Sequence, residues 1–273
     1  MDFKNLDTLR RDLQSQSYGI QWHSIAEYII AETLGDDWLE KNISINSRRV
    51  APFNQELDEE ACVLDYHLNC VRLGHMLFLL KDSPGFDNLL ADAATRDFEP
   101  VFFEMYAASL LVKNGYPVRF VCPTGVRGED YDLQAEIDGK LVAIEVKARR
   151  GGMIENTTTL RNTLRKAKKQ LPADTASIIC IALSTEYKDS DSRKHAKGEI
   201  ENAIADFLRG TKQINGVLAF WNAWEGEPLQ CTTQVTEYRN HEARNYLECP
   251  WLIASQKTPV AAKVQNSFPS FML

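Results

Sequence analysis

The stretch DYDLQAEIDGKLVAIEVK, residues 130–147, decides the fold of this chain. Two alternating runs flank Asp138 and Gly139, and an Asp-Gly pair between such runs is the strongest short-range signal of a β-hairpin. With a two-residue turn, Ile137 faces Lys140, and the same register sets Asp132 opposite Glu145. Because side chains alternate along a strand, we expect one polar and one core-facing side. The polar side holds Asp130, Asp132, Gln134, Glu145 and Lys147, and the core side holds Tyr131, Leu133, Ala135, Val142, Ile144 and Val146.

Helices and strands alternate on both sides of this hairpin. Before it, apolar residues at helical spacing stop at Gly115, and a short strand follows over 117–122. After it come a helix over 156–171, a strand over 177–183, a helix that includes 200–208 and a strand over 216–221. The apolar positions of these two regions include Phe103, Ala107, Leu110 and Leu111, and then Leu160, Leu164, Ala167 and Leu171. The order α-β-β-β-α-β-α-β predicts an α/β fold with a central mixed β-sheet flanked by helices.

Three regions follow from the patterning. Residues 1–96 are expected to form a helical accessory region, because apolar residues repeat at helical spacing up to Gly35 and again up to Leu80. Residues 97–225 form the α/β core. Residues 226–273, which are weakly patterned, are expected to be a C-terminal extension packed on that core.

The composition is that of a globular protein: 273 residues, 44% hydrophobic and 25% charged. No apolar run approaches the ~20 residues of a membrane span, and the start of the chain lacks the apolar segment of a secretory signal. The six cysteines contain no CxxC pair, which favours reduced thiols in a cytoplasmic protein. The histidines show no HxxxH or HxH spacing, so no histidine-based zinc site is expected; they are His23, His67, His75, His195 and His241.

Charge is distributed unevenly. The chain has a net charge of −7, but residues 140–170 contain nine basic and two acidic residues, a net +7, which leaves −14 for the rest. Such a basic island on an acidic body favours contact with a nucleic-acid backbone, and a solvated surface is the alternative. Within it, four cations at i, i+4, i+7 and i+8 form a stripe opposite the leucine face of the expected helix: Arg161, Arg165, Lys168 and Lys169.

The acidic side of the hairpin is expected to need a cation to offset the repulsion between its carboxylates. Opposed residues have Cβ atoms ~4.5–5.5 Å apart, and like charges at that distance destabilise a sheet. Carboxylate oxygens on neighbouring strands are the ligands that Mg²⁺ or Mn²⁺ prefers. Such an ion polarises a phosphoryl oxygen and activates water. Lys147 is expected either to orient that water or to neutralise charge that develops on the phosphate. These groups fit the hydrolysis of a phosphodiester, and the alternative is that the hairpin acids are ordinary surface residues with a purely structural role.

Asp132, thirteen positions before Glu145-Val146-Lys147, resembles the motif of the PD-(D/E)XK nucleases. The order of elements over 98–221 is similar to that family's restriction-endonuclease-like core. Glu104, eleven positions before Gly115, matches the helical glutamate that reaches the metal in related Holliday-junction resolvases. The resemblance implies that Asp132, Glu145, the Val146 carbonyl and Glu104 bind the metal and that Lys147 is catalytic. Tyr131 stands where the family often has proline, so Asp130 remains a second candidate for the role of Asp132.

The resemblance also implies a nucleic-acid partner. DNA is expected, with RNA as an alternative, and the activity is that of a Mg²⁺- or Mn²⁺-dependent deoxyribonuclease, an endonuclease rather than an exonuclease. Residues 1–96 would provide a surface for a homodimer or a partner protein. A nuclease-like module that binds nucleic acid or protein without cutting is the alternative function. The nucleic-acid contacts are expected at Arg149, Arg150, Arg161, Arg165, Lys168, Lys169 and Gln170, the last near a helical glutamine of some family members.

Overall fold

The structure is a computed structural model that describes residues 3–44, 47–48, 59–93, 97–126, 128–148, 157–183, 190–225 and 230–247. All statements below concern these residues. Within them, none of the helices combines the length and the hydrophobicity that crossing a membrane requires.

The described residues form a six-stranded mixed sheet made of β3 (Val118–Phe120), β4 (Leu133–Ile137), β5 (Lys140–Ala148), β6 (Ala176–Ala182), β7 (Gly216–Glu225) and β8 (Gln230–Arg239). The strands lie in chain order across the sheet. The three central strands β5, β6 and β7 are parallel, whereas β3, β4 and β8 pair antiparallel with their neighbours. Parallel neighbours need a crossover, and the helices α7 (Thr157–Gln170) and α8 (Ser190–Arg209) provide the two crossovers.

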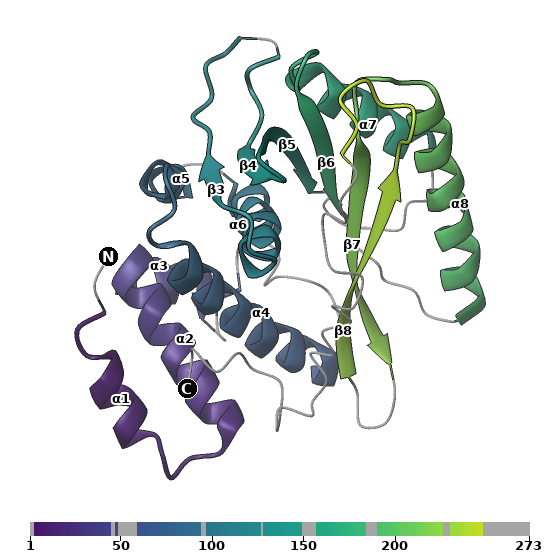
Figure 1. Ribbon diagram of the computed structural model, residues 1–273. Helices are drawn as coiled ribbons and strands as arrows, with labels where there is room; N and C mark the ends of the chain where they lie inside the picture. The colour runs from purple at the N-terminus through teal and green to yellow at the C-terminus, as the bar shows by residue number, and fades with distance from the viewer. Residues whose placement is uncertain are drawn as a thin grey trace.

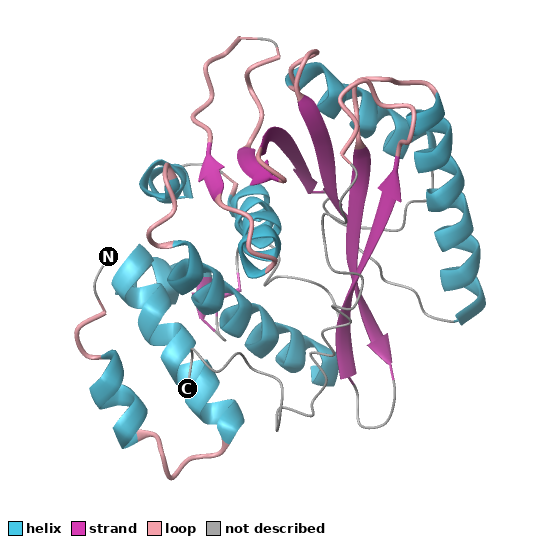
Figure 2. Cartoon of the chain, in the orientation of Figure 1, coloured by secondary structure: helices cyan, strands magenta, loops and turns pink. Residues whose placement is uncertain are grey.

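Helices cover both faces of the sheet (Figures 1 and 2). Helix α6 (Phe98–Lys113) lies against one face, where its side chains share a buried cluster with Leu133, Ile144 and Ile178. Helices α7 and α8 lie against the other face, where a second cluster contains Ala143 and Ile179. The predicted apolar face of α7 is confirmed in this second cluster: Leu160, Leu164, Ala167 and Leu171 are all buried.

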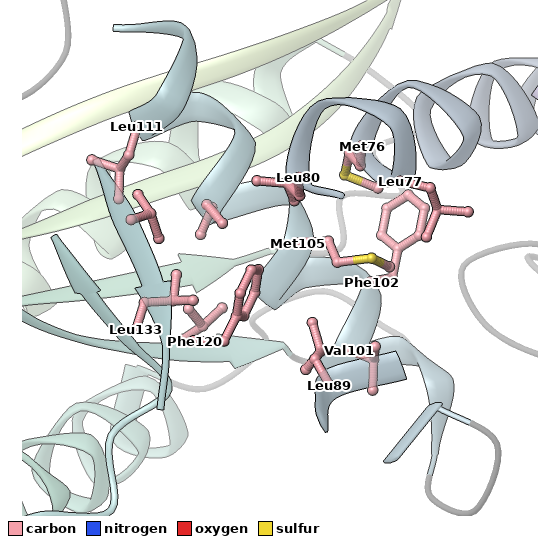
Figure 3. Close-up of a cluster of buried hydrophobic side chains, with 14 of the residues drawn as sticks. Met76, Leu77, Leu80, Leu89, Val101, Phe102, Met105, Leu111, Phe120 and Leu133 are labelled. Atoms are coloured by element: carbon pink, nitrogen blue, oxygen red, sulfur yellow. The ribbon is translucent and has the colours of Figure 1, made fainter. Parts of the chain in front are cut away.

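The N-terminal region is helical, as predicted. It contains α1 (Leu6–Asp12), α2 (Tyr18–Leu34), α3 (Asp36–Asn42), α4 (Glu59–Leu80) and α5 (Phe86–Ala93), with a short ladder between β1 (Ile43–Ser44) and β2 (Ser47–Arg48). Its core is continuous with the core of the sheet. Figure 3 shows Leu77 of α4 beside Phe102 of α6, and Phe120 of β3 near Leu133 of β4.

Two elements differ from the sequence-based expectation. Helix α6 was expected to have one apolar face, but it is buried on most sides because the N-terminal helices pack on it opposite the sheet. Strand β8 was not predicted, and it pairs with β7 along its whole length. Part of the expected C-terminal extension therefore continues the central sheet. The described thiols are free, as expected: Cys70 and Cys180 are buried, and Cys122 is exposed.

Candidate functional site

The turn of the β4–β5 hairpin has the conformation that the sequence predicts. Asp138 and Gly139 both have positive φ, at 54° and 70°, as a two-residue type I′ turn requires. The register is also confirmed, because Ile137 pairs with Lys140 and Leu133 with Ile144. Since β5 continues past the start of β4, its last residues, including Glu145 and Lys147, lie beyond the paired part of the hairpin.

Asp132 lies immediately before β4, and its side chain accepts a hydrogen bond from the backbone of β5. The predicted direct pairing of Asp132 with Glu145 is wrong in detail, because the ladder ends at Leu133 and the Asp132 N–H donates to the Ile144 carbonyl, 3.1 Å away. The carboxylate of Asp132 instead reaches along β5. Its Oδ2 accepts a 2.7 Å hydrogen bond from the Val146 N–H, a donor that β4 leaves unpaired.

The alternation expected for the first strand ends at the same point. Tyr131 was expected on the core side with Leu133 and Ala135, but it packs against the buried cluster of α7 and α8 on the opposite face. The shifted hydrogen bond of Asp132 explains the change, because it puts the backbone before Leu133 out of phase with the ladder. Gln134 lies on the side of Tyr131 and donates to its hydroxyl.

Glu145 is a fully buried carboxylate. Its Oε1 accepts from the Lys147 ammonium, while its Oε2 has no hydrogen-bond partner among the described residues. Burial raises the pKa of Glu145 well above its usual range, the Asp132 carboxylate raises it further, and Lys147 opposes both effects. Asp132 and Glu145 are thus two carboxyl groups in mutual repulsion, compensated by one ammonium whose side chain is 27% exposed.

Asp130 has a different environment from Asp132. Its Oδ1 accepts from the backbone N–H groups of Thr124 and Gly125, at 2.7 and 2.8 Å. Its carbonyl accepts from the Gln170 amide at 3.1 Å. The Asp130 side chain therefore shapes the loop before β4, and Asp132 is the aspartate that neighbours Glu145.

Glu104 projects from the buried side of α6 into a cavity of about 300 Å³ that Asp132 also lines. The other wall comes from α5 and the segment after β3, and it includes Asn88, Asp92 and Cys122. The Asn88 amide donates to the Cys122 thiol across this wall, at 3.0 Å. Sequence reasoning missed these three residues, because no local pattern marks them and only the packing of α5 on β3 brings them to the cavity.

Asp132 is close both to Glu104 of α6 and to Glu145 of β5. It shares the cavity with Glu104, and it interacts with Glu145. Among the described residues, however, no three His, Cys, Asp or Glu side chains converge closely enough to enclose an ion. The donor chemistry nevertheless fits Mg²⁺ or Mn²⁺, since the groups are hard carboxylate oxygens and one of them, Glu145 Oε2, is buried without a partner.

The expected basic stripe on α7 is only partly available to a ligand. The Arg161 guanidinium is paired with Asp206 of α8, at 2.6 Å. Arg165 and Lys169 are exposed, Lys168 is half-buried, and Gln170 is engaged with the loop before β4. The two arginines expected at the exit of β5, Arg149 and Arg150, lie outside the described residues.

Comparisons with protein-family models, with curated proteins and with solved structures find no match to this chain. The fold and the site therefore define its class: an α/β protein with a mixed sheet, in which two carboxylates and a lysine meet beyond the paired part of a central hairpin.

Proposed function

We propose that this chain is a metal-dependent deoxyribonuclease of the PD-(D/E)XK type, with a restriction-endonuclease-like core, acting in the cytoplasm as an endonuclease. The observation that carries the proposal is the buried Glu145 carboxylate, which interacts with both Asp132 and Lys147 and keeps one oxygen without a partner. The ion pair with Lys147 satisfies only one oxygen of Glu145, and a buried polar atom without a partner costs stability. Binding of a cation by the second oxygen would offset this cost.

The residues divide the work as follows. Asp132 and Glu145 would hold Mg²⁺ or Mn²⁺, assisted by the Val146 carbonyl. Glu104 would assist from α6, since it lines the same cavity as Asp132. When bound, the ion supplies polarisation of the scissile phosphate and a water of lowered pKa. The Val146 N–H holds the Asp132 carboxylate in place. Lys147 balances the charge of Glu145 in the free protein and, with a phosphodiester bound, stabilises the negative charge that develops on it.

The test is a cleavage assay with Mg²⁺ or Mn²⁺ on linear, circular, branched and single-stranded DNA and on RNA. We expect cutting that chelation abolishes and that Glu145→Gln or Lys147→Gln lowers by about 100-fold or more, as for the loss of an electrostatic catalytic group. Glu136→Gln is the matched control, because Glu136 is an exposed acid on the same hairpin. Equal cleavage by Glu145→Gln and Glu136→Gln would refute the assignment.

A nuclease-like module that binds without cutting is the second candidate, and it is favoured by the absence of three converging acids among the described residues. Titration of the chain with Mn²⁺ separates the two functions. If the site is catalytic, the wild type binds Mn²⁺ and the Asp132→Asn and Glu145→Gln variants do not. If the chain is a binding module, the heat of Mn²⁺ titration is the same in all three proteins, and all three still bind DNA.

A further inference from the structure

Helix α2 packs along α4 (Figure 1). One histidine from each helix, His23 and His67, meets the other at this contact. The Nδ1 atoms of His23 and His67 lie 3.2 Å apart, although the residues are 44 positions apart in the sequence. The ring centroids are 4.4 Å apart and the rings are nearly perpendicular, at 81°. Tyr66 contacts both rings, with centroid distances of 5.7 and 5.3 Å. Neither histidine belongs to the site proposed for the nuclease.

A carboxylate on the next turn of α2 orients one member of this pair. Nε2 of His23 lies 3.1 Å from Oε1 of Glu27, at i+4. An N–H on Nε2 that donates to this carboxylate leaves Nδ1 of His23 as a lone-pair acceptor directed at His67. Such a carboxylate–histidine pair is the usual means by which proteins set the tautomer and the direction of a metal-binding imidazole.

The separation of the two nitrogens suits a shared metal ion. With metal–nitrogen distances of about 2.0–2.1 Å, two ligands are about 2.9 Å apart at right angles and about 3.35 Å apart in a tetrahedron. The observed 3.2 Å lies between these values. In the free chain the Nδ1–H of His67 donates to Nδ1 of His23. Metal binding therefore requires that His67 carries its proton on Nε2 instead, and that each ring rotates about its soft terminal torsion to direct its Nδ1 lone pair at the ion. Access from solvent exists, since the side chains of His23 and Glu27 are 18% and 40% exposed.

We propose that His23 and His67 form a two-imidazole site for a late first-row divalent cation, Zn²⁺, Ni²⁺ or Cu²⁺, with Glu27 as the residue that orients His23. No third His, Cys, Asp or Glu converges there within the part of the chain that the structure describes, so water or an added ligand completes the coordination. Imidazole favours these metals, whereas carboxylate oxygens favour Mg²⁺ and Mn²⁺. The ion therefore clamps α2 to α4 independently of the acidic site.

The test is a calorimetric titration of the full chain with NiCl₂ in excess Mg²⁺, which occupies the carboxylates. We expect one Ni²⁺ per wild-type chain, and binding at least about ten-fold weaker in His23→Gln and in His67→Gln. His241→Gln is the matched control, because His241 is an exposed histidine after β8, and its binding stays at the wild-type value. Glu145→Gln also keeps the binding, which separates this proposal from that of the nuclease.

The variant Glu27→Gln tests the same site without removing a histidine, so it remains informative if a histidine variant fails to fold. We expect Ni²⁺ binding to weaken about ten-fold in this variant, as for the loss of a supporting carboxylate. We also expect Ni²⁺ to raise the melting temperature of the wild type but not that of His67→Gln. Absence of saturable binding to the wild type, or equal affinity in the wild type and His67→Gln, would overturn the proposal.

Discussion

Gly85 is the residue that sets α5 against β3 and thereby builds one wall of the acidic cavity. Its φ is +81°, and a Cβ built there would lie 2.3 Å from the Phe120 carbonyl oxygen. The Phe120 N–H donates to the Pro84 carbonyl at 2.8 Å, so the two backbones are held in direct contact. A side chain at position 85 therefore meets both an unfavourable φ and an atom of the backbone that cannot rotate away.

The cost of Gly85→Ala follows from these two effects. A non-glycine residue in the left-handed region costs about 1–2 kcal/mol, and overpacking adds about 1–3 kcal/mol. We therefore expect the free energy of unfolding to fall by about 2–5 kcal/mol in total. Gly115 is the matched control, because its φ is +83° and a Cβ there has no atom within 4 Å. Gly115→Ala should lose only the backbone part, about 1–2 kcal/mol.

Urea unfolding of both variants measures the difference. The expected result is a larger loss for Gly85→Ala, accompanied by a greater loss of DNA cleavage, because α5 carries Asn88 and Asp92 to the cavity. If both variants lose the same free energy of unfolding, the overlap with the Phe120 carbonyl contributes nothing, and the account of this wall is refuted.

Two further predictions concern charge. Burial lowers the pKa of His75 to about 3, with Lys113 adding to the effect, so the unfolded chain binds a proton below pH 6.5 that the folded chain does not bind. Stability is therefore lost as the pH falls, by about 2 kcal/mol between pH 6.5 and 5, and urea unfolding should show a shallower pH dependence for His75→Gln; parallel curves would contradict this. Arg165→Ala should lower the slope of log K against log salt for DNA binding by about 1, whereas Arg161→Ala should change it less, because Asp206 already pairs with Arg161. Anisotropy titrations at several salt concentrations measure both slopes, and unchanged slopes would show that α7 makes no contact with phosphate.

The hairpin and its flanking elements were predictable because their determinants are local. Asp138-Gly139 selects the turn, the turn selects the register, and the register brings Asp132 close to Glu145. The leucines of α7 were predictable for the same reason, since the helical period alone determines which side chains share a face. Strand β8 was not predictable, because its sequence is largely polar and its conformation depends on pairing with β7.

The sequence by itself determined the α/β class, the hairpin and the acidic residues that the hairpin carries. Only the tertiary structure decided that Asp130 shapes a loop while the Asp132 carboxylate accepts from the Val146 N–H. It also decided that Asn88 and Asp92 line a cavity with Glu104, and that His23 meets His67. Turns, registers and helix faces depend on residues a few positions apart. A cavity wall or a pair of rings depends on the packing of segments that are distant in the chain, and local sequence patterns do not predict that packing.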